Sequence, residues 1–368
     1  MATLGHVPTA KAAGQAGACA THPDVARPRP STLARQLETW FSTHARSLPW
    51  RDDANGPHGP YRVWVSEIML QQTQVATVVP YYERWMARWP TLADLAGAEL
   101  EEVLGAWAGL GYYARARNLH RATRKAHAEG GVPSTLEGLR ALPGIGPYTA
   151  GAILSIAFEQ KVPLVDGNVA RVLCRHEGLE GDATRPPLSQ TLWARAEALV
   201  AKSHHPGRLN ESLMELGATL CTPRTPACTL CPIQRGCVAR REGRAEALPT
   251  PVPARTRKVN QAFGLLAWHR GALALVRRRP DGLLGGLWEP PLVNAPAVAD
   301  ARNLGHAVHV FTHLELTVHV FETRLHRRGE LTGLEDLYDE VAWHPPGEVG
   351  DVPLSKLARK ILAVGGVG

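Results

Sequence analysis

The sequence predicts a mainly α-helical N-terminal domain followed by a smaller α+β domain, and three observations support this fold class. Apolar residues recur at helical spacing from residue 31 to about residue 245, with Pro and Gly between the periodic stretches. Closely spaced prolines then hold an extended segment over Pro249–Lys258. Beyond it the pattern alternates, as in Leu314–Phe321, which is typical of β-strands. The length of 368 residues is also sufficient for two domains.

The composition is that of a folded protein. Hydrophobic residues make up 44% of the chain and charged residues 20%, which excludes a wholly disordered chain. No uninterrupted apolar run reaches the roughly 18 residues of a membrane span, so no transmembrane helix is expected. The net charge of +7 is evenly spread, because residues 31–245 carry 24 basic and 20 acidic residues and residues 246–368 carry 14 and 13. Composition therefore permits a nucleic-acid partner without indicating one.

The chain divides into four parts by composition and periodicity. The first 30 residues contain 8 Ala, 4 Pro and 3 Gly, and they lack the apolar segment of a secretory signal. The helical region predicts ten or so short helices, and Ser134 with Glu137 resembles a capping box. The predicted order is a disordered tail (1–30), a helical domain (31–245), a linker (246–258) and a strand-rich domain (259–368). Strands are expected at Phe263–Trp268, Ala272–Arg277 and Leu314–Phe321.

Four of the six cysteines lie within 17 residues and predict a metal or cluster site. Clustering in a long chain favours metal ligation over a disulfide scaffold. Zinc and an iron–sulfur cluster both accept four thiolates, and the single C-x2-C pair favours iron–sulfur only slightly. The first interval of the motif is a proline-braced loop that presents Arg224 as a candidate phosphate contact. The four residues are Cys221, Cys228, Cys231 and Cys237.

Three further features each have a chemical and a structural interpretation. In Leu142–Gly146, two glycines expose successive N–H groups at a helix start, which suits a phosphate but also a plain turn. Asp166 precedes a helix, where an aspartate is more often a helix cap than a catalyst. Glu67 is by default a solvated helix carboxylate, but its neighbours are largely apolar, and burial would raise its pKa.

These features stand in an order that resembles one enzyme family. The runs Trp64–Val75 and Gly109–Leu119 closely resemble the MutY family of adenine DNA glycosylases. So do Leu142–Gly146, which would be the hairpin of that family, the Asp-Gly-Asn loop at residues 166–168 and the four cysteines. The resemblance covers about residues 31–245 and continues less strongly to the C-terminus. It implies a helix-hairpin-helix glycosylase fold related to endonuclease III, with a [4Fe–4S] cluster. It also implies removal of adenine mispaired with 8-oxoguanine or guanine in double-stranded DNA.

The resemblance assigns roles to individual residues. Glu67 would protonate N7 of the extrahelical adenine. Asp166, supported by Asn168 and Tyr148, would stabilise the positive charge on the sugar or add to it. The residues placed around the adenine pocket are Arg46, Trp50, Arg51 and Glu211. The residues expected to contact DNA are Gln71, Gln72, Thr73, Leu110, Tyr112, Gly144, Gly146 and Arg224, of which Thr73 and Leu110 also face the 8-oxoguanine.

These residue types suit the implied chemistry. An adenine anion is a poor leaving group, so an acid has to deliver a proton as the C–N bond breaks. The departing base leaves positive charge on the sugar, which an ionised carboxylate stabilises, as in glycoside hydrolysis. Lyase relatives carry a lysine two residues after the last glycine of the hairpin. This chain has Tyr148 there, and because a phenol forms no imine, a monofunctional glycosylase is expected.

Residues 259–368 resemble the MutT-like domain of the same family, which is related to Nudix hydrolases. The run Gly282–Pro290 fits the start of that fold. Pro-Pro-Leu-Val-Asn-Ala-Pro follows Glu289 in place of the acidic cluster that would hold Mg²⁺, so nucleotide hydrolysis is not expected. The lesion-reading loop of the family, Phe-Ser-His, is here Phe311, Thr312 and His313. A metal site is the less favoured interpretation of His309, His313 and His319.

Two rival functions stay open at this stage. An endonuclease III-like pyrimidine-lesion glycosylase with lyase activity is opposed by Tyr148 and by the second domain. A non-catalytic iron–sulfur protein that scans DNA is opposed by the presence of both Glu67 and Asp166. We expect a monomer in the bacterial cytoplasm, associated with the nucleoid and without a membrane partner.

Overall fold

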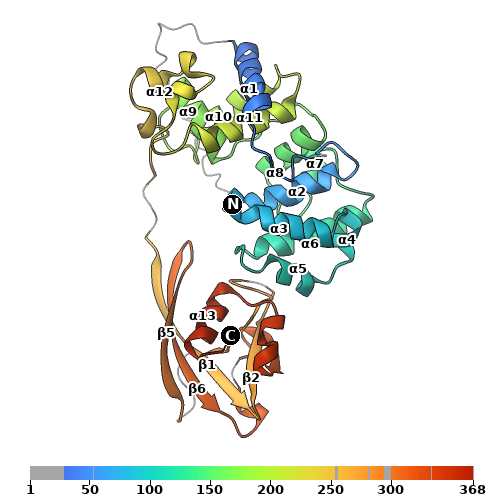
Figure 1. Ribbon diagram of the computed structural model, residues 1–368, viewed down its shortest axis with the longest axis vertical. Helices are drawn as coiled ribbons and strands as arrows, with labels where there is room; N and C mark the ends of the chain where they lie inside the picture. Colours follow the sequence, from blue (N-terminus) through green and yellow to red (C-terminus); the bar gives the residue numbers. More distant parts are fainter. Residues whose placement is uncertain are drawn as a thin grey trace, which may run out of the picture.

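The computed structural model describes residues 29–52, 54–252, 256–280, 282–293, 300–332 and 334–367. The tail expected at residues 1–30 lies outside the described residues, apart from its last two positions. A helical part comes first in the chain, and a sheet with a packed helix follows it along the long axis of the molecule (Figure 1). The predicted class, mainly α followed by α+β, is confirmed.

Short helices make up the first part. The α-helices are α1 (Pro30–His44), α2 (Gly59–Leu70), α3 (Val75–Arg88), α4 (Leu92–Gly97), α5 (Leu100–Trp107), α6 (Ala114–Ala128), α7 (Leu136–Arg140), α8 (Pro147–Ala152), α9 (Gly167–Glu177), α10 (Leu188–Val200), α11 (Pro206–Thr219) and α12 (Val238–Arg241). A π-helix, η1 (Ile153–Ala157), continues α8. Several helices, α2, α8 and α11 among them, have proline in the first turn, where its missing N–H leaves no helix bond unmade.

The helices form two groups. Helices α2 to α8 pack around the buried indoles of Trp64, Trp85 and Trp107, and the Trp85 ring meets the Trp107 ring edge to face. The second group contains α1 and α9 to α12, with α11 in contact with α1, α9 and α10 (Figure 1). Helix α2 is buried along most of its length because α3, α6, α8 and η1 all pack against it.

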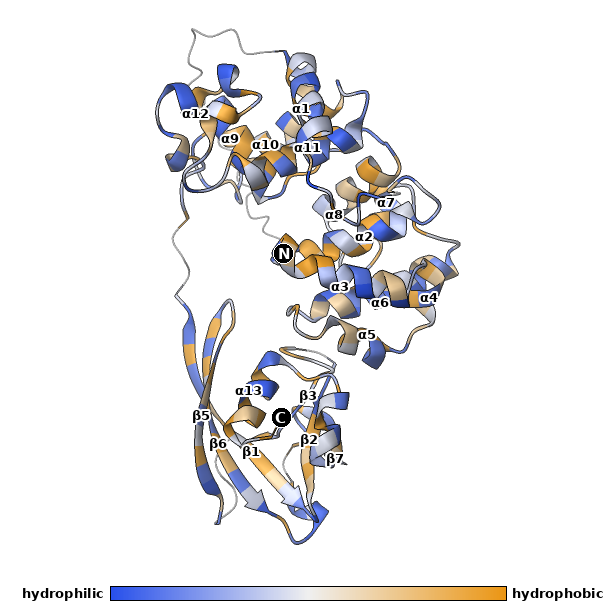
Figure 2. Ribbon diagram, in the orientation of Figure 1, coloured by the Kyte–Doolittle hydropathy of each residue, from blue (hydrophilic) through white to orange (hydrophobic). Residues whose placement is uncertain are grey.

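The second part is a seven-stranded sheet with α13 (Lys356–Val364) on one face. The strand order is β3-β2-β1-β6-β5, with β4 paired to β1 and β7 to β2, and β1 runs parallel to β6. Leu266, Val318 and Val320 pack with Ile361 and Leu362 of α13. Figure 2 shows hydrophobic and hydrophilic residues mixed along β6, where buried and less buried positions alternate. The strands are β1 (Lys258–His269), β2 (Ala272–Arg278), β3 (Trp288–Glu289), β4 (Leu292–Val293), β5 (Arg302–Val310), β6 (Leu314–Arg324) and β7 (Tyr338–His344).

The two parts touch through the segment that leads into β3. Leu287 is buried within the helical core. The indole N–H of Trp288 donates to Glu101 of α5 at 2.9 Å, and the guanidinium of Arg117 donates to the Gly285 carbonyl at 2.6 Å. The second domain is therefore docked on α5 and α6, the helices that flank the loop at residues 109–113.

Local details differ from the sequence prediction. Thr135, and not Ser134, caps α7, because its backbone is extended and its hydroxyl accepts the Gly138 N–H at 3.1 Å. The three predicted strands lie within β1, β2 and β6, whereas β5 and β7 were not predicted. These two strands form because they pair with β6 and β2, and their own alternation is weak.

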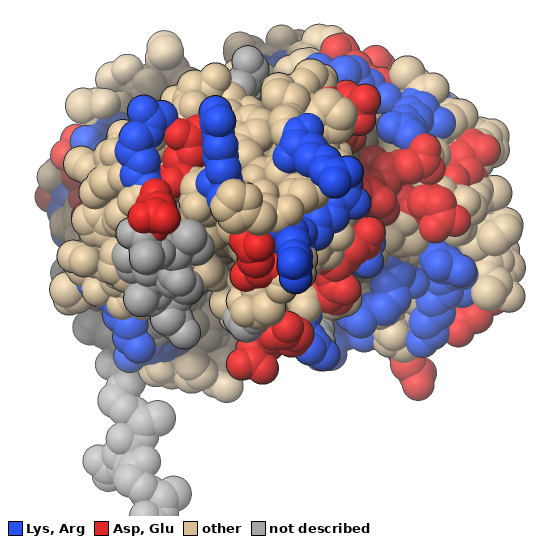
Figure 3. Space-filling model, turned by 90° about the horizontal axis from the view of Figure 1, so that it is seen from below, with Lys and Arg blue, Asp and Glu red and all other residues tan. Residues whose placement is uncertain are grey.

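The surface and the helix lengths add two findings. Seen from the C-terminal end, basic and acidic side chains are interspersed (Figure 3), which agrees with the near balance of charge in residues 246–368. Within the described ranges, no helix is long and apolar enough to span a membrane.

Candidate functional site

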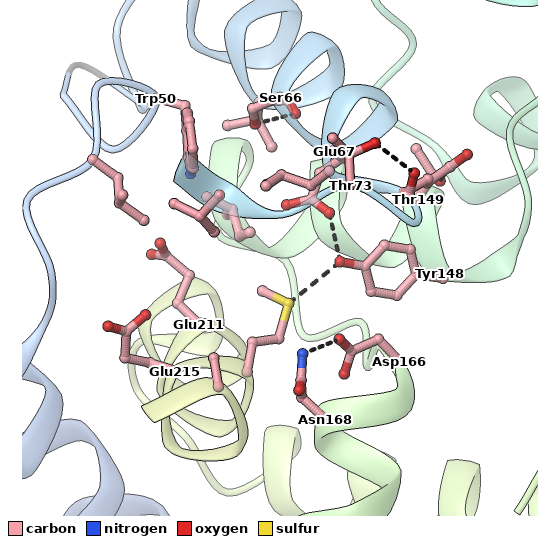
Figure 4. A pocket seen from close by; sticks show the side chains of 18 of the residues that line it. Trp50, Ser66, Glu67, Thr73, Tyr148, Thr149, Asp166, Asn168, Glu211 and Glu215 are labelled. Carbon is pink, nitrogen blue, oxygen red and sulfur yellow. Dashed lines mark hydrogen bonds between the residues drawn. The ribbon is translucent and has the colours of Figure 1, made fainter. Parts of the chain in front are cut away.

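A cleft of about 700 Å³ lies between the two groups of helices. Helices α2 and α8 form one wall, and α11 with the start of α9 forms the other (Figure 4). Its volume is in the range of small-ligand sites. The predicted residues that line it are Arg46, Trp50, Arg51, Glu67, Gln71, Gln72, Thr73, Gly144, Gly146, Tyr148, Asp166, Asn168 and Glu211.

Glu67 stands near the end of α2 with its side chain in the cleft, and it is 5% exposed. Burial raises the pKa of its carboxyl to about 7. The hydroxyl of Tyr148 donates to Oε2 at 2.5 Å and opposes this rise, while the charges of Asp166 and Glu211 add to it. The carboxyl therefore holds its proton close to neutral pH, as a general acid requires.

Asp166 is the N-cap of α9. One carboxylate oxygen, Oδ1, accepts the Val169 N–H at 2.7 Å, and Oδ2 accepts the amide of Asn168 at 2.8 Å. Burial raises the pKa of this carboxyl, while these hydrogen bonds and the charge of Arg171 oppose the rise. Donors directed at both oxygens favour the ionised form. The helix cap thus holds a carboxylate at the cleft wall opposite Glu67 (Figure 4).

Tyr148 departs from the expectation that it supports Asp166. Its hydroxyl donates to Glu67 and lies 3.3 Å from the sulfur of Met214, whereas the side chain that donates to Asp166 is Asn168. Helix α8 packs beside α2, which turns the phenol toward Glu67. Burial, with the charges of both carboxyls, raises the pKa of Tyr148 well above its usual value, so it stays a donor.

Two glutamates of α11 hold two arginines at the cleft. Arg46 donates to both oxygens of Glu215, at 2.6 and 2.9 Å, and Arg51 donates to Glu211 at 2.8 Å and to Glu215 at 3.0 Å. Burial would raise the pKa of Glu215, but the two guanidinium groups outweigh it and lower that pKa. Glu215 was not predicted. The available signal was its position four residues after Glu211, on the same helix face.

The loops after α2 and before α6 carry the residues expected to enter DNA. Gln72 and Tyr112 have φ angles of 56° and 50°, in the left-handed region that residues other than glycine rarely occupy. Tyr112 is 47% exposed, whereas Leu110 is 6% exposed and packs in the helical core. The structure therefore presents Tyr112 at the surface and places Leu110 in the interior. Thr73 accepts a hydrogen bond from Arg115, a residue that was not predicted.

Gly144 and Gly146 form the expected turn between α7 and α8. The φ angle of Gly144 is 80°, and a Cβ there would lie 2.8 Å from the Cβ of Asn118, so the position requires glycine. Gly146 is the N-cap of α8. Both the turn and a role for its N–H groups toward a phosphate fit this geometry. Arg224 is exposed in the cysteine loop.

A second cavity, of about 430 Å³, lies between the two domains. Tyr112 lines it from the helical side, and Phe311, Thr312 and His313 line it from the turn between β5 and β6. The hydroxyls of Tyr112 and Thr312 are 2.8 Å apart. The loop expected to read a lesion therefore meets a residue expected to enter the duplex, across 200 positions of sequence.

The four clustered cysteines line one small cavity, and none of them forms a disulfide. Burial raises the pKa of Cys231 to about 12 and also raises that of Cys237, and neighbouring cysteines add to both. In the part of the chain that the structure describes, no three or more His, Cys, Asp or Glu side chains form a group that could hold a metal ion. His309 pairs with Leu316, so the two side chains share one face of the sheet. His319 lies three positions after Leu316 in the same strand and therefore points to the opposite face, away from His309.

Two arginines surround the cysteine loop, and neither was predicted. Arg175 is 2% exposed, and its guanidinium lies 3.4 Å from the sulfur of Cys221. Among the described residues, its other acceptors are backbone carbonyls, so the buried charge faces sulfur and not a carboxylate. Arg171 donates to Asn168 at 2.8 Å and to the Cys221 carbonyl at 2.7 Å, and thus joins the loop to the cleft.

The chain is similar to known DNA repair proteins in its first part and to NUDIX domains in its second part. Residues 65–198 match the model of the HhH-GPD superfamily base excision DNA repair proteins, and residues 262–364 match a NUDIX domain. The adenine DNA glycosylase of Rattus norvegicus is 40% identical over 366 residues, which cover 80% of this chain and 71% of that protein. The adenine DNA glycosylase of Homo sapiens is 40% identical over an alignment that covers 89% of this chain and 73% of that protein. The solved structure of a thermostable thymine-DNA glycosylase superposes with a TM-score of 0.51 at 27% identity, over 58% of this chain and 97% of that one.

Proposed function

The chain belongs to the adenine DNA glycosylase family, as its motifs indicated, and from this premise we propose that it removes adenine paired with 8-oxoguanine or guanine in duplex DNA. The observation that carries the proposal is a pair of carboxyls on opposite walls of one cleft, of which Glu67 is buried and Asp166 is half-buried. Glu67 has a raised pKa and a phenol partner, and Asp166 has donors on both oxygens. When their environments push the pKa values of two carboxyls apart, one serves as the acid and the other as the anion.

The proposed reaction starts with an adenine turned out of the duplex into the cleft. Glu67 delivers its proton to N7 as the C–N bond breaks, and Tyr148 holds the acid in place through Oε2. Asp166 faces the sugar and stabilises its positive charge until water completes the hydrolysis. Arg46, Arg51 and Glu211, joined through Glu215, form a rigid edge of polar groups for the base.

The reaction is proposed to stop at base removal. Tyr148 occupies the position of the lyase lysine, and no lysine is among the described residues that line the cleft. In the second domain, Glu289 is 1% exposed and accepts hydrogen bonds from Arg278 at 2.7 Å and Tyr338 at 2.8 Å. Its carboxylate is thus occupied inside the fold, which supports a domain that reads DNA and does not hydrolyse nucleotides.

Lesion recognition is proposed for Phe311, Thr312 and His313, with Tyr112 as the residue that enters the duplex. Thr312 offers the hydroxyl of the family's serine with an added methyl group, and it is exposed at the second cavity. We further propose that the protein acts as a monomer on chromosomal DNA in a bacterial cell.

The protein is expected to lose activity as pH rises. The kcat/KM for adenine release should fall about tenfold per pH unit above the pKa of Glu67, which burial raises to about 7, because only the protonated carboxyl donates. At low pH it should fall again as Asp166 takes up a proton. Initial rates across a pH series, with duplex binding measured in parallel, check this. A kcat/KM that is flat through neutral and alkaline pH would contradict the role of Glu67.

Although no group of the described side chains is arranged to hold a metal ion, a [4Fe–4S] cluster on Cys221, Cys228, Cys231 and Cys237 is proposed as the cofactor. The donor set is all sulfur, the thiols are free, and the buried charge of Arg175 lies beside them, where an anionic thiolate cluster would compensate it. When bound, the cluster supplies a rigid cross-link for the loop that carries Arg224.

Purified protein is therefore expected to be brown and to contain about four iron and four sulfide per chain. Replacing Cys228 with serine should lower the iron content and the melting temperature together. Metal analysis after anaerobic preparation measures the iron content, and thermal unfolding of the same preparations measures the melting temperature. A colourless protein with one zinc per chain would decide for the alternative ligand.

Base release is the experiment that tests the function. The protein is incubated with duplexes that contain adenine opposite 8-oxoguanine, adenine opposite guanine, or thymine glycol, and released base and strand breaks are scored separately. The proposal expects adenine release without strand cleavage, fastest opposite 8-oxoguanine. Release of thymine glycol with strand breaks would support the endonuclease III-like rival, and binding without release would support the scanning protein.

A further inference from the structure

We propose that Arg115 is a positioning residue that ties the end of α2, which carries Glu67, to the loop that carries Tyr112. When Tyr112 contacts the lesion side of the duplex, the position of its loop would thereby influence the position of Glu67. The inference rests on the proposed function and adds a residue that couples lesion recognition to base removal.

The guanidinium of Arg115 joins two segments that are distant in the sequence. From the first segment it contacts four oxygens, and from the second two. Nη1 donates to the carbonyls of Ile68 at 2.8 Å, Met69 at 3.0 Å and Gln71. Nη2 donates to the Thr73 hydroxyl at 3.2 Å and to the carbonyls of Gly111 at 3.2 Å and Leu110 at 3.5 Å.

On the first side, Arg115 completes the end of α2. The last carbonyls of a helix have no partner within the helix, and a cation there also interacts favourably with the helix dipole. Ile68 and Met69 lie in the last turn of α2, directly after Glu67. Holding these carbonyls therefore holds the backbone that aims the acid into the cleft.

On the second side, Arg115 supports the loop that presents Tyr112. The rings of Trp107 and Tyr112 each lie 5.3 Å from the guanidinium carbon, so the cation is stacked by both. Trp107 also donates to the Gly111 carbonyl at 3.0 Å. Tyr112 has left-handed backbone, which a loop adopts only when its surroundings hold it there.

The geometry of the group matters more than its charge. All six acceptors are neutral oxygens, and they are distributed over both segments. A planar guanidinium presents several donors in a fixed fork, whereas an ammonium is a compact point charge with one nitrogen. Lysine at this position would keep the cation near the rings and would not span both segments.

The test compares Arg115→Met, Arg115→Lys and the control Leu192→Ala, in which a buried side chain of α10 is truncated in the other helix group. Single-turnover rate constants are measured on duplexes with adenine opposite 8-oxoguanine and opposite guanine. Both Arg115 variants should lower the ratio of these rate constants by about 5- to 150-fold, the range of a typical coupling between sites. Leu192→Ala should lose thermal stability and keep the wild-type ratio.

Hydrogen exchange measures, independently of base release, whether Arg115 holds both segments, a connection called the bridge below. In both Arg115 variants, amides of residues 68–73 and 109–113 should exchange faster, and in Leu192→Ala they should not. Faster exchange in one segment alone would overturn the bridge, as would full restoration of the ratio by lysine. If the wild-type protein prefers 8-oxoguanine and Arg115→Met prefers it equally, the inference fails and the proposed function stands. If the wild-type protein shows no preference, the proposed lesion preference itself fails.

Discussion

Exchange of Glu67 for glutamine is expected to slow adenine release by about 10²- to 10⁴-fold, the usual contribution of a general acid. The amide has nearly the shape of the carboxyl, and its oxygen should keep the hydrogen bond that the carboxyl accepts from Tyr148 at 2.5 Å, but it delivers no proton to the leaving base. Single-turnover release from a duplex with adenine opposite 8-oxoguanine measures the effect. Affinity for the same duplex should survive, because the residues expected to contact DNA are unchanged.

A matched control separates chemistry from folding. Glu197→Gln makes the same change at an exposed position of α10 and should leave the rate of release unchanged. Above neutral pH the variant Glu67→Gln should be at least as stable as the wild type. The wild-type carboxyl has to ionise there while buried, and the amide does not. Rates of Glu67→Gln near the wild-type value would show that another group is the acid.

Removal of residues 246–368 is expected to reduce the preference for 8-oxoguanine over guanine more than it slows release of adenine opposite guanine. Both carboxyls, the hairpin and the cysteines precede residue 246, whereas Phe311, Thr312 and His313 follow the linker. Loss of one or two hydrogen bonds to the lesion costs about 1–3 kcal/mol, or roughly 5- to 150-fold in discrimination. Rate constants on the two duplexes, for the full chain and for residues 1–245, give the ratio.

Truncation removes Leu287 and exposes the part of the helical core that Leu287 covers in the full chain. A point variant in the full chain controls for this new apolar surface. His313→Ala should shift the ratio in the same direction by a smaller factor, with unchanged thermal stability, because His313 is exposed. Equal loss of activity on both duplexes in the truncated protein would mean that the second domain serves folding or general DNA affinity. The lesion-reading role would then be wrong.

Features with local causes could be predicted from the amino-acid pattern. Helical periodicity followed by alternation predicted the two parts, because each period reflects how one element exposes its faces. Gly144 was predicted in a segment between two helices that suits a phosphate or a plain turn, and its φ of 80° has a local cause in either case. The four cysteines predicted a common site because short intervals keep them close, and they do line one cavity. The family motifs singled out Glu67 and Asp166, which the fold brings to one cleft.

Which side chains meet, and how deeply they are buried, depends on how the helices pack and could not be predicted. Tyr148 bonds to Glu67 and not to Asp166 because α8 packs against α2. Leu110 is buried while Tyr112 is exposed, although the two are neighbours in one motif. The pKa of Glu67 is raised because several helices exclude water from it, which no local pattern specifies. Arg115 contacts a segment that lies more than 40 residues before it in the chain, so its role follows from the packing of α2 against α6.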